Sequence, residues 1–289
     1  MLVSGGRTGT QFFGDRMSLA ISKCFSVHDP DVLSVFLTRN LSRIRKFGFR
    51  HMVLDRILCR GGLRSTGQLL LCGKLTEAEA LRRVRLARES YYASINEPLI
   101  VESNTQWMHI IELVPKVWPQ AKIIVIVRDP RTWIRSWLNK GFHQRPYDPA
   151  RWFPPGRYTP ATVGDQEWTS RWLSFDTFGR LAWEWRYVYG RLSAFAQAYS
   201  QVEIFRFEDI FSGPKTSEMC RLVEFAANHG PQGFATEVPS QFGAVIKNAS
   251  RGAAVDWSGW TRKQRVLVES MCGELMCEFG YGMAPGKAQ

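Results

Sequence analysis

The chain has 289 residues, a formal net charge of +12 and 45% hydrophobic residues, so it can hold one large α/β domain or two small ones. No apolar run approaches the roughly 20 residues of a membrane-spanning helix, and no secretory signal pattern follows Met1. With Met1 as the true start, we expect a cytoplasmic protein. The six cysteines form no CxxC pair and no zinc spacing, which predicts reduced thiols and no structural metal.

Strand-like apolar runs and helix-like segments alternate along the chain. In chain order they predict a strand at 2–5, a helix at about 10–22, a short segment near 25–27, a basic helical segment at about 39–95, a strand at 99–102, a helix at about 105–117, a strand at 122–127, a helix at 131–140, a loop at about 141–170, a helix at about 176–199, a strand at 202–207, and helices at about 214–228 and 260–279. This alternation predicts an α/β fold, with a parallel sheet flanked by helices, in a single domain over residues 1–289.

The turn after the first strand has the composition of an anion-binding loop. Backbone N–H groups of a glycine-rich turn converge on an anion, and the following helix adds the positive end of its dipole. An ordinary strand–turn–helix corner is the structural alternative. The candidate ligand-binding residues of this turn are Gly6, Arg7, Thr8, Gly9, Thr10 and Gln11.

This turn departs from the P-loop of nucleotide triphosphatases, which reads Gly, four residues, then Gly-Lys-Ser/Thr. Counted from Gly9, Ser4 stands at the first glycine position. Thr10 stands at the lysine position and Gln11 at the position of the magnesium-binding hydroxyl. The cation, Arg7, comes before Gly9 instead. The turn therefore suits a donor group that is less charged than a γ-phosphate and needs no magnesium ion.

A second anion-binding pattern follows a buried strand. Residues 123–127 are continuously apolar, as in a strand covered on both faces of a parallel sheet. Arg128 stands at the end of this strand, and Ser136 follows eight residues later on the next predicted helix. This spacing can direct a guanidinium and a hydroxyl toward one phosphate. The alternative for Arg128 is a structural ion pair with Asp129 or Glu208.

These two motifs resemble those of sulfotransferases that use 3′-phosphoadenosine 5′-phosphosulfate (PAPS). Residues 6–10 resemble the 5′-phosphosulfate loop of the family, in which a subset of members has arginine at the position of Arg7. Arg128 with Ser136 resembles the 3′-phosphate motif. The resemblance implies a P-loop-like core, PAPS as co-substrate and no metal ion.

The resemblance continues toward the C-terminus. Residues 205–210, Phe-Arg-Phe-Glu-Asp-Ile, resemble the strand of the family that ends in an aromatic-Glu-Asp element. Arg251 and Gly252 resemble its C-terminal phosphate-binding loop, and the segment from Trp257 to Tyr281 resembles its last helix. The resemblance implies that Arg251 and Gly252 also bind the donor.

Three residues are candidates for the general base. His28 lies twenty-one residues after Arg7, a spacing that resembles that of the catalytic carboxylate in some relatives. A neutral histidine suits proton abstraction near pH 7, whereas Asp29 would need a pKa raised by burial. Either residue could instead cap the turn that follows. Glu102 resembles the Glu-x-Ser/Thr element of the family. We expect it to orient the substrate or to have a structural role, and a role as base is the third choice.

Four charged residues follow strands at different points of the chain. Arg7, Glu102, Arg128 and Glu208 each stand at or just beyond the end of a predicted strand. Ligands of open parallel sheets bind at the carboxyl ends of the strands. We therefore expect these side chains to converge on one site.

The basic charge is concentrated in residues 39–88, which hold thirteen Lys/Arg and three acidic residues. A helical segment that packs on the core with a basic outer face is the interpretation we favour. An acidic acceptor or an anionic membrane surface would also match this charge, and peripheral membrane contact is an open expectation. Nucleic acid is not an expected partner, because the chain carries no recognisable binding motif.

The acceptor is not encoded by any motif that we find. The predicted loop at about 141–170 is rich in proline and aromatic residues, and such loops often act as lids. Its rings could stack on a sugar or a phenol, or could cover apolar surface. The expected function is sulfuryl transfer to a hydroxyl or amine of a carbohydrate, lipid or small metabolite. A P-loop kinase and a non-catalytic nucleotide-binding or membrane-associated scaffold are the alternatives.

Overall fold

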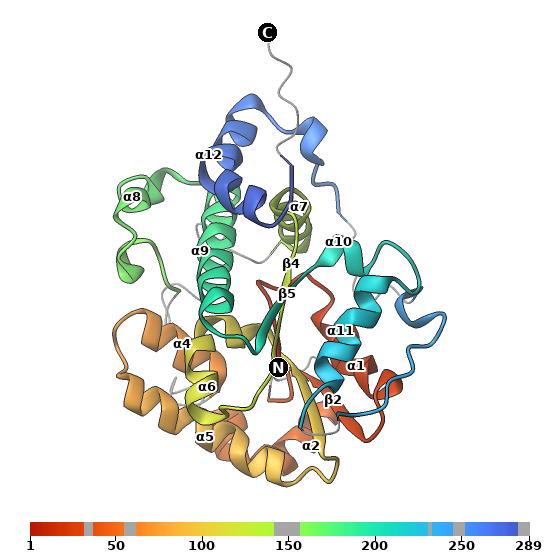
Figure 1. The fold of residues 1–289 in the computed structure, drawn as a ribbon. Coiled ribbons are helices and arrows are strands. Elements are labelled where there is room, and N and C mark those ends of the chain that lie inside the picture. The colour runs from red at the N-terminus through yellow and green to blue at the C-terminus, as the bar shows by residue number, and fades with distance from the viewer. Residues whose placement is uncertain (32–36, 55–61, 142–156, 231–232, 245–251, 283–289) are drawn as a thin grey trace.

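The computed structural model describes residues 1–31, 37–54, 62–141, 157–230, 233–244 and 252–282. Within these residues, five parallel strands form one sheet in the order β2-β3-β1-β4-β5, with helices on both faces (Figure 1). The strands are β1 (Leu2–Val3), β2 (Cys24–His28), β3 (Leu99–Ser103), β4 (Ile123–Val127) and β5 (Val202–Arg206). The predicted α/β fold with a parallel sheet is confirmed.

The helices lie in the connections between the strands and in the segment that follows β5. The α-helices are α1 (Thr10–Ala20), α2 (Leu37–Phe47), α4 (Leu63–Leu71), α5 (Glu77–Ala93), α6 (Val114–Val117), α7 (Pro130–Lys140), α8 (Gln166–Thr169), α9 (Thr177–Ala198), α10 (Phe207–Ile210), α11 (Ser217–Ala227) and α12 (Arg262–Glu278). Shorter 3₁₀ or π turns are η1 (Arg50–Leu54), η2 (Thr105–His109), η3 (Ile111–Leu113), η5 (Ala161–Val163), η6 (Trp172–Ser174), η7 (Phe242–Ala244) and η8 (Trp257–Gly259).

One predicted helix is wrong. The segment 105–117 forms the 3₁₀ turns η2 and η3 and then the short α6, and it does not form one continuous helix. Pro115 explains the break, because a proline inside a helix removes a backbone donor and its ring clashes with the carbonyl four residues earlier. In the structure Pro115 instead stands in the first turn of α6, where its missing N–H costs nothing.

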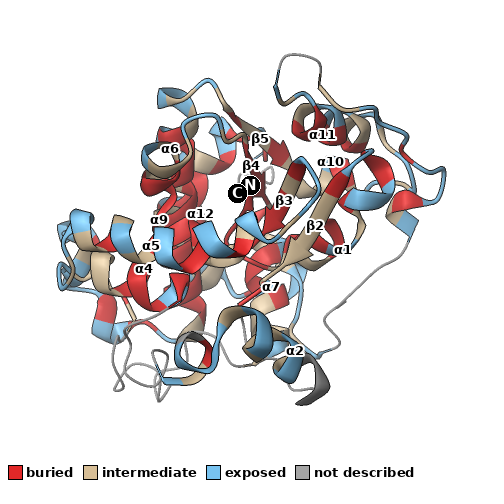
Figure 2. Ribbon diagram, turned by 90° about the horizontal axis from the view of Figure 1, so that it is seen from below, coloured by how far each residue is buried: buried red, intermediate tan, exposed pale blue. Residues whose placement is uncertain are grey.

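The central strand β4 is covered on both faces of the sheet. All five residues of β4 are buried. Because strand side chains alternate, Ile124 and Ile126 pack with α1 and α11, whereas Ile123, Val125 and Val127 pack with α5, α7, α9 and α12. Figure 2 shows the buried residues gathered along the strands and on α9, with exposed residues on the outer sides of α2 and α5.

The connections leave the sheet in opposite directions at its centre. After β1 the chain enters α1 on one face, whereas after β3 and β4 it enters η2, η3 and α7 on the other face. β1 pairs with both β3 and β4, so the carboxyl ends of these three strands surround the point where the connections diverge. Ligands of open α/β sheets bind at such a point.

No helix in the described part of the chain is both long enough and apolar enough to span a bilayer.

Candidate anion-binding site

The loop after β1 is held in a left-handed conformation. Gly6, Arg7 and Gly9 have φ angles of 79°, 59° and 76°. A Cβ at Gly6 would lie 2.9 Å from the ring of Trp137, so this position needs glycine for space as well as for its φ angle. The Gly6 carbonyl accepts a 2.8 Å hydrogen bond from Nε1 of Trp133. Left-handed residues in a short turn can direct neighbouring N–H groups toward one side, as in known anion-binding loops.

Side chains beneath the loop fix its shape. Oγ of Ser4 accepts hydrogen bonds from the Gly6 N–H at 3.1 Å and from Oγ1 of Thr8 at 2.6 Å. The hydroxyl of Tyr189, on α9, accepts from the Gly5 N–H at 3.2 Å. Ser4 and Thr8 are fully buried. The loop is therefore preorganised before any ligand binds.

The loop leads into the N-terminus of α1. Gly9 is the N-cap residue of this helix, and no side chain caps it. Thr10 is the first helical residue and is buried, with Gln11 beside it. The carbonyl of Thr10 accepts a 2.7 Å hydrogen bond from Oγ of Ser103, at the end of β3. The positive end of the α1 dipole therefore lies at the carboxyl edge of the sheet, where an anion would be stabilised.

The second predicted motif meets the loop in space. Nε of Arg7 donates to Oγ of Ser136 at 2.9 Å, and Nη1 of Arg128 donates to the Arg7 carbonyl at 2.7 Å. Nε of Arg128 also donates to Oγ1 of Thr132 at 3.0 Å, and its guanidinium lies over the ring of Phe207 at 4.4 Å. Residues that are about 120 positions apart in the sequence thus form one cluster at the carboxyl ends of β1 and β4.

Two guanidinium groups lie close together in this cluster. Burial lowers the pKa of Arg7. Burial also lowers the pKa of Arg128, the nearby charge of Arg7 lowers it further, and Glu208 opposes the shift. Two partly buried cations that repel each other are a favourable place for a bound anion.

The alternative ion pairs of Arg128 are engaged elsewhere. The carboxylate of Asp129 pairs with Arg131 through a two-pronged contact of 2.5–2.9 Å. Glu208 accepts from the Asp129 N–H at 3.1 Å and from the hydroxyl of Tyr281 at 2.8 Å. The aromatic-Glu-Asp element therefore supports the start of α7. Glu208 is connected to Arg128 through Thr132, whose hydroxyl accepts from Arg128 at 3.0 Å and donates to Glu208 at 3.4 Å.

Of the predicted C-terminal loop, Arg251 lies outside the described residues, whereas Gly252 is described. A Cβ on Gly252 would overlap the side chain of Asn139, near the end of α7. Oδ1 of Asn139 accepts a 2.8 Å hydrogen bond from the N–H of Ala254. Asn139 follows Ser136 by one helical turn, so the segment of Gly252 crosses the same helix that carries Ser136.

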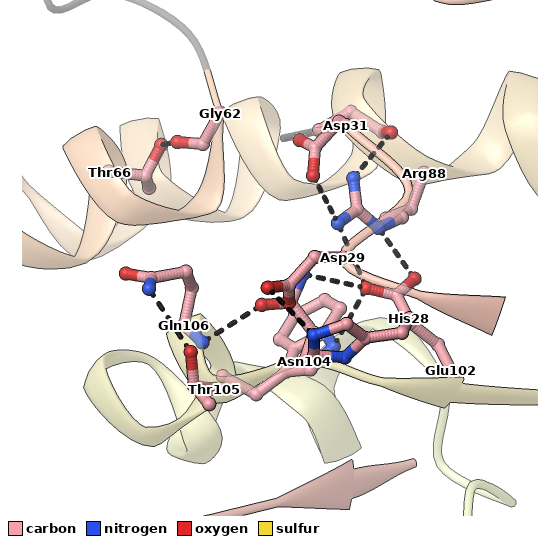
Figure 3. Close-up of polar contacts among 12 residues, drawn as sticks. His28, Asp29, Asp31, Gly62, Thr66, Arg88, Glu102, Asn104, Thr105 and Gln106 are labelled. Carbon is pink, nitrogen blue, oxygen red and sulfur yellow. Dashed lines mark hydrogen bonds and ion pairs between the residues drawn. The ribbon is translucent and has the colours of Figure 1, made fainter. Parts of the chain in front are cut away.

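The candidate bases His28 and Asp29 lie at the end of β2. Nδ1 of His28 is 3.0 Å from the carbonyl of Ser103, and Nε2 is 3.3 Å from Oδ2 of Asp29 (Figure 3). Asp29 has a φ angle of 41°, which is uncommon outside glycine and best tolerated by Asp and Asn. Burial raises the pKa of Asp29 to about 6, while the charge of His28 opposes this shift.

Glu102 is enclosed in a network of donors. It is 1% exposed, and its carboxylate accepts five hydrogen bonds of 2.8–3.2 Å. Figure 3 shows Arg88 and Asn104 beside it. The donors are Arg88, through Nε and Nη2, and single groups of Tyr92, Asn104 and Trp107. Such a saturated carboxylate favours the structural interpretation of Glu102 over a role as base.

The basic segment is not uniformly solvated. Arg88, on α5, is fully buried, with Nη2 3.0 Å from Oδ1 of Asp31 in addition to its contacts with Glu102. Arg82 and Arg85, on the same helix, are exposed. The described segment therefore combines a basic outer face with one arginine that serves the core.

Residues 142–156 of the predicted aromatic loop lie outside the described part of the chain. In the remainder, Tyr158 and Trp168 are buried in the core. The hydroxyl of Tyr158 donates to Glu184 on α9 at 3.1 Å. These two rings cover apolar surface and are not open to stack on an acceptor.

Two features near the loop carried no sequence signal. Tyr189 and Trp133 contact the loop from helices that follow β4, and nothing in their local sequence marks them as loop contacts.

Among the described residues, no three His, Cys, Asp or Glu side chains are grouped so as to hold a metal ion. One described cavity, lined by Leu99, Trp118 and Lys122 among others, lies at the amino-terminal edge of the sheet and hence opposite the loop.

Comparison of the chain with protein-family models, with curated proteins and with solved structures finds no match in any of the three. The assignment of a family therefore stays a prediction from the motifs.

Proposed function

We propose that the protein transfers a sulfuryl group from PAPS to a hydroxyl or amine of an acceptor. The observation that carries this proposal is the cluster of Arg7, Arg128 and Ser136, joined by hydrogen bonds of 2.7 and 2.9 Å across three segments of the chain. The cluster lies beside the preorganised glycine-rich loop, which leads into the N-terminus of α1. Together these features offer two cations, a hydroxyl and backbone N–H groups to a ligand that bears two separate anionic groups.

Each part of the site has a role in this proposal. The loop of residues 6–11 and Arg7 bind the 5′-phosphosulfate, while Arg128, Ser136 and the segment of Arg251 and Gly252 bind the 3′-phosphate. The 3′-phosphate distinguishes PAPS from ATP. Glycan, lipid and small-metabolite acceptors, and an accessory contact with an anionic membrane through residues 39–88, belong to the same proposal.

The chemistry is an in-line displacement at sulfur. The acceptor O–H bond breaks and its proton passes to a base, while the acceptor oxygen forms a bond to sulfur. The bond between sulfur and the bridging oxygen breaks, and its electron pair remains on the 5′-phosphate of adenosine 3′,5′-bisphosphate. Arg7 and the loop N–H groups stabilise the negative charge that develops on this oxygen.

The kinase alternative has less support from the chain. Thr10 stands where a kinase would place its phosphate-binding lysine, and it is buried as the first residue of α1. Gln11 stands at the position of the magnesium-binding hydroxyl and offers none.

The test is thermal stabilisation by adenosine 3′,5′-bisphosphate, compared with ADP plus Mg²⁺. A ligand at about 100 times its Kd adds about 2.7 kcal/mol to the free energy of unfolding, which is a visible shift. We expect a shift with the bisphosphate alone, its loss in Arg7→Ala, and its retention in Arg85→Ala, which removes an exposed arginine from α5.

A shift with ADP and Mg²⁺ only would favour the kinase. No shift with either nucleotide would contradict donor binding and would leave the scaffold as the better candidate. Transfer of ³⁵S from labelled PAPS to glycan, phenol and lipid acceptors would then identify the acceptor class of a protein that binds the bisphosphate.

A further inference from the structure

The hydrogen bonds of His28 define which of its ring nitrogens carries hydrogen. Nδ1 lies 3.0 Å from the carbonyl of Ser103. A carbonyl oxygen only accepts hydrogen bonds, so Nδ1 must be the donor. In the neutral ring, Nε2 then carries a lone pair, and this lone pair faces Oδ2 of Asp29 at 3.3 Å.

Two lone pairs at this distance repel each other unless a proton lies between them. We infer that the protonated form of the His28–Asp29 pair holds one proton between Nε2 and Oδ2, and that in the deprotonated form Asp29 takes the proton of the acceptor through Oδ1. His28 is then a positioning residue that acts through Asp29. The second half of this inference rests on the proposed sulfuryl transfer, whereas the first half does not.

Oδ1 is the second carboxylate oxygen of Asp29. It is buried and has no hydrogen-bond partner among the described residues. A buried carboxylate oxygen without a donor is costly, by roughly 1–3 kcal/mol or more. The neighbouring carboxylate of Glu102 is saturated by five donors. An incoming hydroxyl would therefore find an unused acceptor at Asp29 and none at Glu102.

Ser103 connects the pair to the donor loop. Its carbonyl accepts from Nδ1 of His28 and from the N–H of Asp29 at 3.2 Å. Its hydroxyl donates to the carbonyl of Thr10, at the end of the donor loop. The pair and the loop are thus attached to the same residue, at the carboxyl end of β3.

The charges around Asp29 allow it to lose its proton near neutral pH. Burial raises its pKa to about 6, and Glu102 and Asp31 act in the same direction. His28 and Arg88 act in the opposite direction. From the other side, α1 packs against His28 through Gly14, which adds no charge. The base form of the pair is therefore present above about pH 6 and is lost as the pH falls through this value.

The proton balance of the step is complete. In the base form, His28 is neutral with hydrogen on Nδ1, and Asp29 is a carboxylate. The acceptor proton moves to Oδ1 as the acceptor oxygen attacks sulfur, and the electron pair of the broken S–O bond leaves with adenosine 3′,5′-bisphosphate. After product release the pair returns this proton to solvent.

The shared proton is tested by NMR of ¹⁵N-labelled histidine, with the signal of His28 identified by its absence in His28→Asn. We expect hydrogen on Nδ1 at pH 8, and an Nε2 signal that follows the protonation of Asp29 near pH 6 and no longer does so in Asp29→Asn. Asparagine accepts the φ angle of 41°, so this variant keeps the backbone. Hydrogen on Nε2 and none on Nδ1 at pH 8 would overturn the inference.

The role as base is tested by hydrolysis of ³⁵S-labelled PAPS, with water as the acceptor. We expect release of sulfate to rise with pH to a plateau with a midpoint near 6, and Asp29→Asn to slow it by about 10²-fold or more. His28→Asn keeps a donor for Ser103 but removes Nε2. Because the charge of His28 lowers the pKa of Asp29, its loss should move the midpoint upward. His229→Gln, a histidine at the other edge of the sheet, is the matched control and should change nothing.

The outcomes separate the inference from the proposed function. If the protein binds adenosine 3′,5′-bisphosphate but Asp29→Asn hydrolyses PAPS at the wild-type rate, or His28→Asn slows hydrolysis without moving the midpoint, the assigned roles are wrong. A wild-type protein that binds the bisphosphate and hydrolyses PAPS with no dependence on pH between 5 and 8 would also contradict them. If the bisphosphate does not bind, the proposed function fails, and the NMR result still decides whether the proton is shared.

Discussion

At the scale of single residues, Arg128 joins the two motifs that are predicted to bind anions. Its Nη1 holds the Arg7 carbonyl, its Nε holds Thr132, and the ring of Phe207 supports its plane. A guanidinium fixed at several points loses little entropy when it binds a phosphate. The neighbouring carboxylate of Asp129 is occupied by Arg131, which leaves Arg128 directed toward the loop.

Arg128→Ala should weaken binding of adenosine 3′,5′-bisphosphate more than binding of adenosine 5′-phosphosulfate, which lacks the 3′-phosphate. Loss of a charge-assisted contact costs about 1.5–3 kcal/mol, a factor of roughly 10–100 in Kd. Isothermal titration calorimetry measures both ligands. Arg131→Ala removes a neighbouring cation and should leave the ratio of the two affinities unchanged. Equal weakening of both ligands by Arg128→Ala would refute the assigned contact.

At the scale of elements, the crossing of α1 and β2 depends on a glycine inside a helix. A Cβ on Gly14 would lie 2.5 Å from Cβ of His28 and 2.6 Å from its backbone nitrogen. Glycine in a helix interior costs about 0.5–1 kcal/mol relative to alanine. The close approach of helix and strand offsets this cost and brings His28 beside the helix that begins at the glycine-rich loop.

Gly14→Ala should destabilise the protein by about 1–3 kcal/mol, because β2 backbone must move to admit the methyl group. Gly190→Ala, inside α9, is the matched control. The nearest atom to its added Cβ would be a Leu275 methyl at 3.6 Å, which is ordinary contact. This control should stabilise the protein by about 0.5–1 kcal/mol. Urea denaturation measures both, and a neutral Gly14→Ala would show that the crossing is not tight.

At the scale of the whole molecule, the core on the α9 side of the sheet includes titratable groups. His109 is 3% exposed, and neither ring nitrogen has a hydrogen-bond partner among the described residues. Burial lowers its pKa to about 3, from the ordinary value of 6.5. Below pH 6.5 the unfolded chain therefore binds a proton at His109 that the folded protein does not. As a result, the free energy of unfolding decreases progressively as the pH falls toward 3. Asp29, whose pKa is raised, acts with the opposite sign between about pH 6 and 4.

His109→Phe should therefore reduce the loss of stability between pH 7 and pH 5 by about 2 kcal/mol, because one pKa unit corresponds to 1.36 kcal/mol. The ring can keep its edge-on contact with Tyr158. Chemical denaturation measures the free energy of unfolding at pH 7 and at pH 5 for the wild type and for the variant. Any effect of the substitution that is the same at both pH values cancels in the difference between them. An unchanged difference would mean that His109 titrates normally in the folded protein.

Much of the architecture was predictable because it is encoded locally. The apolar run at 123–127, the glycine turn at Gly6 to Thr10 and the regular spacing of strands and helices predicted the parallel α/β sheet. The meeting of Arg7, Arg128 and Ser136 was also predictable, since parallel strands bring their carboxyl ends to one edge. The continuous helix predicted at 105–117 is wrong, because Pro115 does not fit inside a helix and stands in the first turn of α6.

The amino-acid sequence by itself determined the elements and the edge of the sheet where the charged residues gather, because periodicity and turn chemistry act over a few residues. Only the tertiary structure decided the partners of each polar group. Arg88 reaches Glu102 and saturates it, Tyr189 braces the loop from 184 residues away, and Nδ1 of His28 meets the carbonyl of Ser103. Hydrogen bonds depend on angles and distances that packing sets, so no local pattern contains them.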